Sequence, residues 1–199
     1  MPHPPGPFAC FAGTRNAAWP VGRTAPDSLH TMLTIRPFEI DDRDEALAAR
    51  TELDADDFDF LLGYSYRRGF DEYLEQLAAH EQGLGLPDGW VASALWGAFV
   101  DGELVGRTCI RFELNEHLLQ VGGHIGYGVR PGHRRRGHAT EILRLSLDQL
   151  AARGIKSALV TCDEQNTASA RTIEANAGVL ENIIEAGGRR TMRFWVPTS

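Results

Sequence analysis

The sequence lacks long apolar runs and has few cysteines. Although 43% of its 199 residues are hydrophobic, no apolar run reaches the roughly 18 residues that a membrane-spanning helix needs. The first residues, MPHPPGPFACFAG, show no basic start followed by an apolar stretch, so we expect no secretory signal. The three cysteines have no metal-ligand spacing, and their odd number argues against a disulfide framework. These absences predict a cytoplasmic protein with free thiols, no membrane attachment and no metal.

Positive charge is also in the minority. The chain carries 20 Lys and Arg against 27 Asp and Glu, for a formal net charge of −7. A nucleic-acid binder usually presents a basic face, so we expect no nucleic-acid partner. One turn departs from this balance, because Arg134, Arg135 and Arg136 stand side by side between Gly132 and Gly137.

Two segments of the chain differ in composition. Residues 1–31 are rich in proline and glycine and show no periodic apolar pattern, which predicts a flexible N-terminal extension. Residues 32–199 contain regular apolar patterns, and their length suits one globular domain with its own core.

The apolar patterns of residues 32–199 predict the order of strands and helices. We expect strands over 33–36, 124–129 and 156–162, and hairpins over 94–112 and 179–196 that turn at Asp101-Gly102 and Gly187-Gly188. We expect helices from Asp41 or Asp42 to about Leu53, over 70–83, from 139 to Gly154, and over 166–177. This order predicts an α/β (α+β) fold in which helices flank a mixed, largely antiparallel central sheet.

The arginine turn stands between a strand and the clearest amphipathic helix of the chain. The free N–H groups of a first helical turn attract anions, glycine lets a ligand approach the backbone, and arginine adds bidentate contacts to phosphate. The alternative is a solvated basic loop. A nucleotide-triphosphate loop is excluded, because His138 stands in place of its lysine and Ala139 in place of its Ser or Thr. The Gly-x-Gly-x-x-Gly dinucleotide motif is absent.

This stretch resembles the GNAT acyl-CoA N-acyltransferases. Their signature, Arg/Gln-x-x-Gly-x-Gly/Ala at the start of the central helix, reads here as RRRGHA over residues 134–139. The preceding YGVRPGH is similar to the end of the family's fourth strand. LVTCDEQNTASARTIEANAG is similar to its fifth strand, its asparagine and the helix that follows. The resemblance covers residues 32–196 and is nearest to a bacterial group of acetyltransferases whose acceptors are unassigned.

The resemblance implies how acetyl-CoA binds. Backbone N–H groups of residues 135–139 would hold the pyrophosphate, and the pantetheine arm would lie along the 124–129 strand where it diverges from residues 159–162. The cofactor-binding residues that it implies are Tyr127, Val129, Arg134, Arg135, Arg136, Gly137, His138, Ala139, Asn166 and Ser169.

A base must accept the proton of the acceptor amine, which is almost wholly protonated near neutrality at a reference pKa of about 10.4. His124 is the first candidate, because histidine has a reference pKa of about 6.5 and this one is in phase with Gly126 and Gly128. A structural or solvated role for His124 is the alternative. Water is a further candidate, and the weaker side-chain candidates are Glu113, Glu116, His117, Asp163 and Glu164.

One residue departs from the family pattern. Many members carry a tyrosine seven residues after the asparagine, near the thiolate, and here that position is Ile173. A thiol with a pKa near 8.5 can leave as an anion without a proton donor. Departure assisted by this tyrosine is therefore in doubt, but catalysis is not excluded.

The acceptor is weakly specified. The acidic run TELDADDFDF, residues 51–60, suits a cationic amine, or it is a solvated face. Trp90 and Trp96 are expected in packing rather than in ligand binding. The resemblance implies an acetyl-CoA-dependent N-acetyltransferase that modifies a primary amine of a small molecule or peptide by direct attack in a ternary complex. The alternative is a non-catalytic acyl-CoA-binding regulatory module, and a homodimer is left open.

Overall fold

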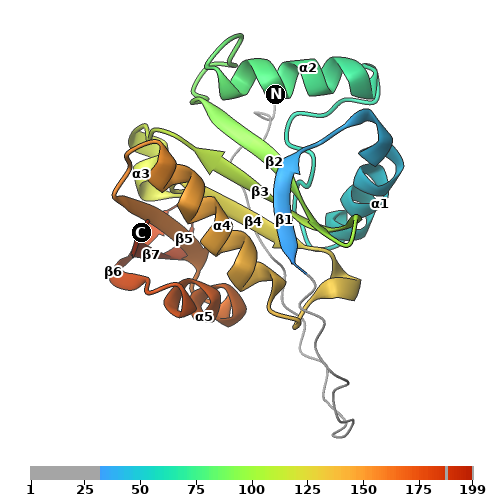
Figure 1. Cartoon of the computed structure of the whole chain (residues 1–199). Helices are drawn as coiled ribbons and strands as arrows, with labels where there is room; N and C mark the ends of the chain where they lie inside the picture. Colours follow the sequence, from blue (N-terminus) through green and yellow to red (C-terminus); the bar gives the residue numbers. More distant parts are fainter. Residues whose placement is uncertain (1–31, 187, 199) are drawn as a thin grey trace, which may run out of the picture.

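The computed structural model describes residues 32–186 and 188–198 (Figure 1). The predicted extension, residues 1–31, and Gly187 of the predicted final turn lie outside the described residues.

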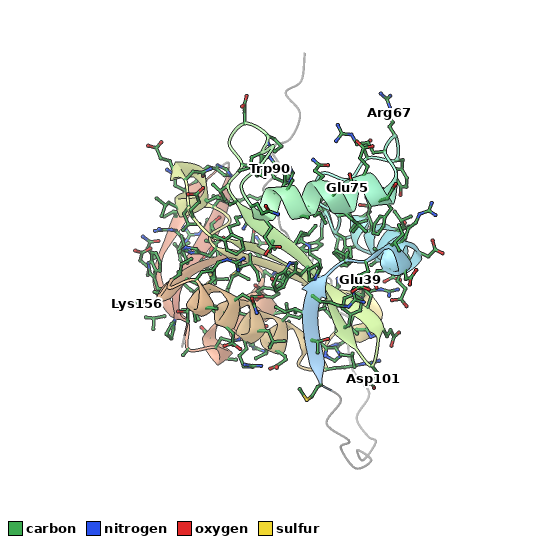
Figure 2. All side chains as sticks on the ribbon, turned by 45° about the horizontal axis from the view of Figure 1, so that its top comes forward. Glu39, Arg67, Glu75, Trp90, Asp101 and Lys156 are labelled. Carbon is green, nitrogen blue, oxygen red and sulfur yellow. The ribbon has the colours of Figure 1, made fainter. Side chains whose placement is uncertain are left out.

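Four antiparallel strands form the first sheet, in the order β1-β2-β3-β4. Their bounds are Leu33–Pro37 for β1, Ser93–Val100 for β2, Glu103–Arg111 for β3 and Ile125–Val129 for β4. The turn between β2 and β3 lies at Asp101 and Gly102, as predicted, with φ values of 51° and 86°. Both values are positive, as the two-residue hairpin turn favoured by Asp-Gly requires. Figure 2 labels Asp101 at the tip of this hairpin.

Three further antiparallel strands form the second sheet, in the order β5-β7-β6. Their bounds are Ser157–Asp163 for β5, Val179–Ala186 for β6 and Arg189–Pro197 for β7. The largely antiparallel sheet is therefore confirmed, but it is divided, because β4 and β5 are edge strands of two different sheets. Among the described strands, the division leaves one edge of β4 and one edge of β5 without a neighbouring strand.

Helices cover both faces of the strands (Figure 1). Their bounds are Arg43–Asp54 for α1, Phe70–Glu81 for α2, Glu116–Gln120 for α3, His138–Ala152 for α4 and Thr167–Ala175 for α5, with short 3₁₀ turns at Ile40–Asp42 (η1) and Pro131–His133 (η2). One core joins α1, α2 and the segment between them to β2 and β3. A second core packs α4 and α5 against the opposite face and against β5 and β7.

Two local predictions need correction. The sequence prediction missed α3, although Asn115 caps it by accepting a hydrogen bond from the Leu118 N–H at 2.9 Å. Asp42 occupies the N-cap position of α1, but its side chain makes no capping hydrogen bond to the helix. Its carboxylate instead accepts from the Arg36 guanidinium at 2.6 and 2.8 Å and from the Glu39 N–H at 2.7 Å. A charged donor that folding brings close holds this carboxylate away from the helix end.

Candidate active site

The outer edge of β4 presents main-chain groups that β3 does not use. The Arg111 N–H donates to the His124 carbonyl at 2.7 Å, and the Arg130 N–H donates to the Val105 carbonyl at 2.9 Å. Hydrogen-bonded pairs alternate along an antiparallel ladder, so the even-numbered residues of β4 face β3. The main chains of Ile125, Tyr127 and Val129 therefore face outward, and the pairing of the latter two with the cofactor stays a prediction.

The two sheets meet beside the start of β4. The His124 N–H donates to the Leu159 carbonyl at 2.7 Å, and the His124 Nδ1 accepts from the Leu159 N–H at 2.9 Å. Among the described strands, β4 pairs with β3 and with no other, so the edges of β4 and β5 part beyond this point. This divergence agrees with the one that the resemblance implies at residues 159–162.

The N-terminus of α4 follows β4 directly and carries unused donors. Gly137 is its N-cap, with φ 84°, and the first helical bond runs from the Glu141 N–H to the Gly137 carbonyl at 3.1 Å. No described side chain caps this helix, whereas Asn166 caps α5. The first N–H groups of α4 are thus left without helical partners. Arg135 also has a positive φ, 62°, which is uncommon outside glycine and collects at functional sites.

The arginines around this turn divide into two pairs. Arg130 binds Glu52 through two hydrogen bonds of 2.6 and 2.9 Å, and it holds the pKa of that carboxyl below its usual range. Arg134 donates to Asp56 at 2.5 Å and to the Val129 carbonyl at 3.0 Å. These contacts tie the turn to Glu52 in α1 and to Asp56, two residues after the helix ends. Arg135 and Arg136, with Gly137, are exposed.

The acidic run therefore has a structural use that the sequence prediction did not foresee. Glu52 and Asp56 are ion-paired to the arginine turn, although Glu52 also stays exposed to solvent. The run itself gives no sign of these ion pairs, because the arginine partners lie 78 residues further along the chain.

The segment after α1 covers β4 on the face opposite α4. The Arg107 guanidinium is fully buried, and it donates to the Gly126 carbonyl at 3.1 Å and to the Asp59 carbonyl at 2.7 Å. The Cζ atom of Arg107 lies 4.3 Å from the centre of the Phe58 ring. That ring packs on Gly128, where an added Cβ would lie 2.4 Å from its nearest carbon. Gly128 is needed here because the aromatic ring occupies the space of a side chain.

His124 is buried, with 8% of its surface exposed. Burial, together with the positive charge of Arg111, lowers its pKa to about 4, and the contact with the Leu159 backbone acts in the opposite direction. Because Nδ1 accepts a hydrogen bond from the Leu159 N–H, the neutral ring carries its proton on Nε2. The role of His124 as the base stays a prediction. What the structure shows is that the ring accepts a hydrogen bond from Leu159 of the second sheet.

Tyr127 and the start of α5 come together across the two edge strands. The Tyr127 hydroxyl lies 2.9 Å from the Ser169 Oγ, and the Ser169 N–H donates to the Asn166 Oδ1 at 3.0 Å. Burial raises the pKa of the neighbouring Cys162 thiol to about 11, which keeps the thiol protonated near neutrality. Ile173 is fully buried in the core formed with α4 and β7.

The weaker base candidates are scattered. Asp163 accepts from the Gln165 N–H at 2.8 Å, and Glu164 is paired with Arg190 on the surface. Glu116 lines a shallow pocket of about 530 Å³ between α3 and the strands β6 and β7. The pocket is lined by Glu116, Leu119, Gln120, Ile184, Glu185 and Arg193.

Both predicted packing tryptophans are confirmed. Trp90 packs beside α2, with its ring centre 5.6 Å from that of His80, and Trp96 donates from Nε1 to Glu81 at 3.3 Å. Within the described part of the chain, no helix is both long and apolar enough to cross a membrane. The same residues contain no group of three or more His, Cys, Asp or Glu side chains suited to a metal ion.

Comparison with solved structures finds this fold in acetyltransferases. One from Salmonella typhimurium, which modifies the N-terminal serine of ribosomal protein L7/L12, is 16% identical with a TM-score of 0.60, over 85% of this chain and 97% of that one. YncA from Salmonella typhimurium, with its cofactor acetyl-CoA, is 15% identical with a TM-score of 0.56, over 84% and 94%. RimJ from Mycobacterium smegmatis, with a CoA disulfide, is 19% identical with a TM-score of 0.60, over 83% and 81%.

These likenesses establish the shared fold, and a family match goes further. No curated protein sequence matches the chain. The model of the acetyltransferase (GNAT) family matches residues 52–178, which is more than half of the chain. The matched stretch runs from α1 through the arginine turn to the end of α5. The chain therefore belongs to the GNAT family and is an acetyl-CoA-dependent N-acetyltransferase.

Proposed function

We propose that this enzyme transfers the acetyl group of acetyl-CoA to a primary amine of a small molecule or peptide, by direct attack in a ternary complex. The observation that carries the proposal is the continuity of two unused sets of donors. The outward main chain of β4 leads directly into the uncapped N-terminus of α4. An extended amide-bearing arm with a pyrophosphate at one end matches that order of groups.

The pyrophosphate would bind at the arginine turn. The N–H groups of residues 137–140 offer donors and the positive end of the helix dipole. Arg135 and Arg136 would add charge from the solvent side, while Arg134 shapes the turn through Asp56. The pantetheine amides would pair with the main chain of Tyr127 and Val129, and Asn166 and Ser169 would border them from α5.

Acetyl transfer needs a neutral amine and a departing thiolate. The amine nitrogen forms a bond to the thioester carbon, the carbon–sulfur bond breaks, and the amine proton passes to a side chain or water. Because Ile173 is apolar and buried, it donates no proton to the sulfur. We infer that the thiolate leaves as an anion and is protonated afterwards by water.

The acceptor would approach on the face opposite α4 and α5. The pocket between α3 and β6–β7 adjoins the connection that leads into His124. Its two carboxylates, Glu116 and Glu185, beside the apolar Leu119 and Ile184, suit an amine attached to an apolar group. An N-terminal peptide amine that carries an apolar side chain fits this description, and the structural neighbour that modifies a ribosomal protein also acts on a peptide N-terminus, there a serine.

The test is thiol release from acetyl-CoA with a panel of small amines and N-terminal peptides, followed by mass spectrometry of each acceptor. We expect release that depends on the acceptor, with a mass gain of one acetyl group on it. A non-catalytic acyl-CoA-binding module predicts instead that calorimetry detects acetyl-CoA binding while no amine or peptide is modified.

A further inference from the structure

We propose that the His124 side chain is a positioning residue that replaces a main-chain acceptor and fixes the point at which β4 and β5 diverge. The inference rests on the proposed binding of the cofactor between these two edges. In this role the imidazole touches neither reactant, and it acts by holding Leu159 and the start of β4 in register.

The main chain alone does not complete this junction. The His124 N–H is used by the Leu159 carbonyl, and the His124 carbonyl is used by the Arg111 N–H of β3. The Leu159 N–H is therefore left to a side chain, and the His124 Nδ1 accepts it at 2.9 Å. The residue thus makes a two-bond bridge to the second sheet while it stays bonded to the first.

The surrounding residues are arranged for a close approach at this point. Gly123 has φ 60°, and an added Cβ would lie 2.3 Å from the Leu159 carbonyl oxygen. The Gly122 N–H donates to the Oγ1 of Thr161 at 3.0 Å, and Thr161 follows Leu159 by two residues in β5. The Arg111 guanidinium holds the Gly122 and Gly123 carbonyls at 3.2 and 3.1 Å. Arg111 of β3 and Thr161 of β5 therefore both hold the connection that leads into His124.

The bridge requires a neutral ring. Nδ1 can accept from the Leu159 N–H only while it is unprotonated, and Nε2 then carries the proton. The positive charge of the Arg111 guanidinium acts on the ring and opposes a second positive charge there. This arrangement gives the ring an acceptor function toward the protein and leaves it no lone pair for a substrate amine.

Three substitutions separate this role from that of a base. In His124→Asn the Oδ1 occupies the place of Nδ1 and can accept from the Leu159 N–H, whereas in His124→Gln the amide reaches the place of Nε2. His124→Ala removes both. With full-length protein, we expect His124→Ala and His124→Gln to raise the KM for acetyl-CoA at least tenfold. We expect His124→Asn to restore most of that loss and to keep the acid limb of the wild-type pH–rate profile.

Two results would overturn the proposal. A kcat that falls 100-fold or more in both Asn and Ala variants, with an unchanged KM and a lost acid limb, would make His124 the base. Wild-type KM values in all three variants would mean that the bridge positions nothing. If the Ala variant does not fold, the comparison of Asn with Gln decides alone. Failure of the proposed function is recognised separately, because the wild type itself would then either bind no acetyl-CoA or bind it without modifying any acceptor.

Discussion

Gly137 is the residue at which charge can be tested with least change in shape. Its φ of 84° lies in the left-handed region, which Asn and Asp tolerate better than other side chains, and no described atom lies within 4 Å of an added Cβ. We predict that Gly137→Asp lowers acetyl-CoA affinity at least tenfold relative to Gly137→Asn, about 1.4 kcal/mol. Isothermal titration calorimetry measures both affinities. Equal affinities in the two folded variants would contradict the assignment of the pyrophosphate site to this turn.

Ile173 occupies the position of the missing tyrosine and is fully buried. We predict that Ile173→Ala costs about 2 to 5 kcal/mol of stability, because it leaves a cavity in the core. If the thiolate leaves without a donor, turnover of the folded variant should change by less than about tenfold. Urea unfolding and steady-state turnover measure the two effects, with Ile173→Val as the conservative control. A loss of turnover by orders of magnitude with intact cofactor binding would contradict the unassisted departure.

His124 also links stability to pH. Its pKa is lowered in the folded state from 6.5 to about 4, so below pH 6.5 the unfolded chain binds a proton that the folded chain does not. Stability should therefore be full above pH 6.5 and decline as the pH falls toward 4, by about 2 kcal/mol after allowance for nearby solvent. Unfolding free energies across this range should show a smaller decline in His124→Asn. Parallel curves for the two proteins would contradict the prediction.

At the scale of the element, β4 depends on glycine for its packing against the segment after α1. An added Cβ at Gly128 would lie 2.4 and 2.6 Å from two carbons of Phe58. We predict that Gly128→Ala destabilises the protein by about 1 to 3 kcal/mol, as overpacking does. The matched control is Gly132→Ala in the following turn, where no described atom lies within 4 Å of an added Cβ. Similar melting temperatures for the two variants would show that the Phe58 segment moves freely.

At the scale of the whole molecule, cofactor binding should join the two sheets. The outward N–H groups of Ile125, Tyr127 and Val129 have no strand beside them in the described structure, so they should exchange with solvent readily. We predict that acetyl-CoA slows the exchange of these amides and of residues 137–140, and leaves β6 unchanged. Hydrogen exchange followed by mass spectrometry or NMR checks this. Protection spread evenly over both sheets would argue against binding at their divergence.

Much of the fold followed from local patterns. The Asp101-Gly102 turn, the apolar stripe of α4 and the glycine after it, and the asparagine before α5 each act within a few residues. Such signals predict elements because turn geometry and helix periodicity are short-range properties. They missed α3, since its Asn115 cap precedes only five helical residues.

The element order, the family resemblance and the expected anion site at the glycine-rich helix start could all be predicted from the order of residues. Which arginines of that site pair with carboxylates became clear from the packing of the folded chain. Arg130 and Arg134 find carboxylates 78 residues away, and the His124 Nδ1 finds the Leu159 N–H 35 residues away. Partners this distant are set by how sheets and helices pack, and burial then decides whether a ring such as His124 carries a proton. No spacing along the chain encodes either of these outcomes.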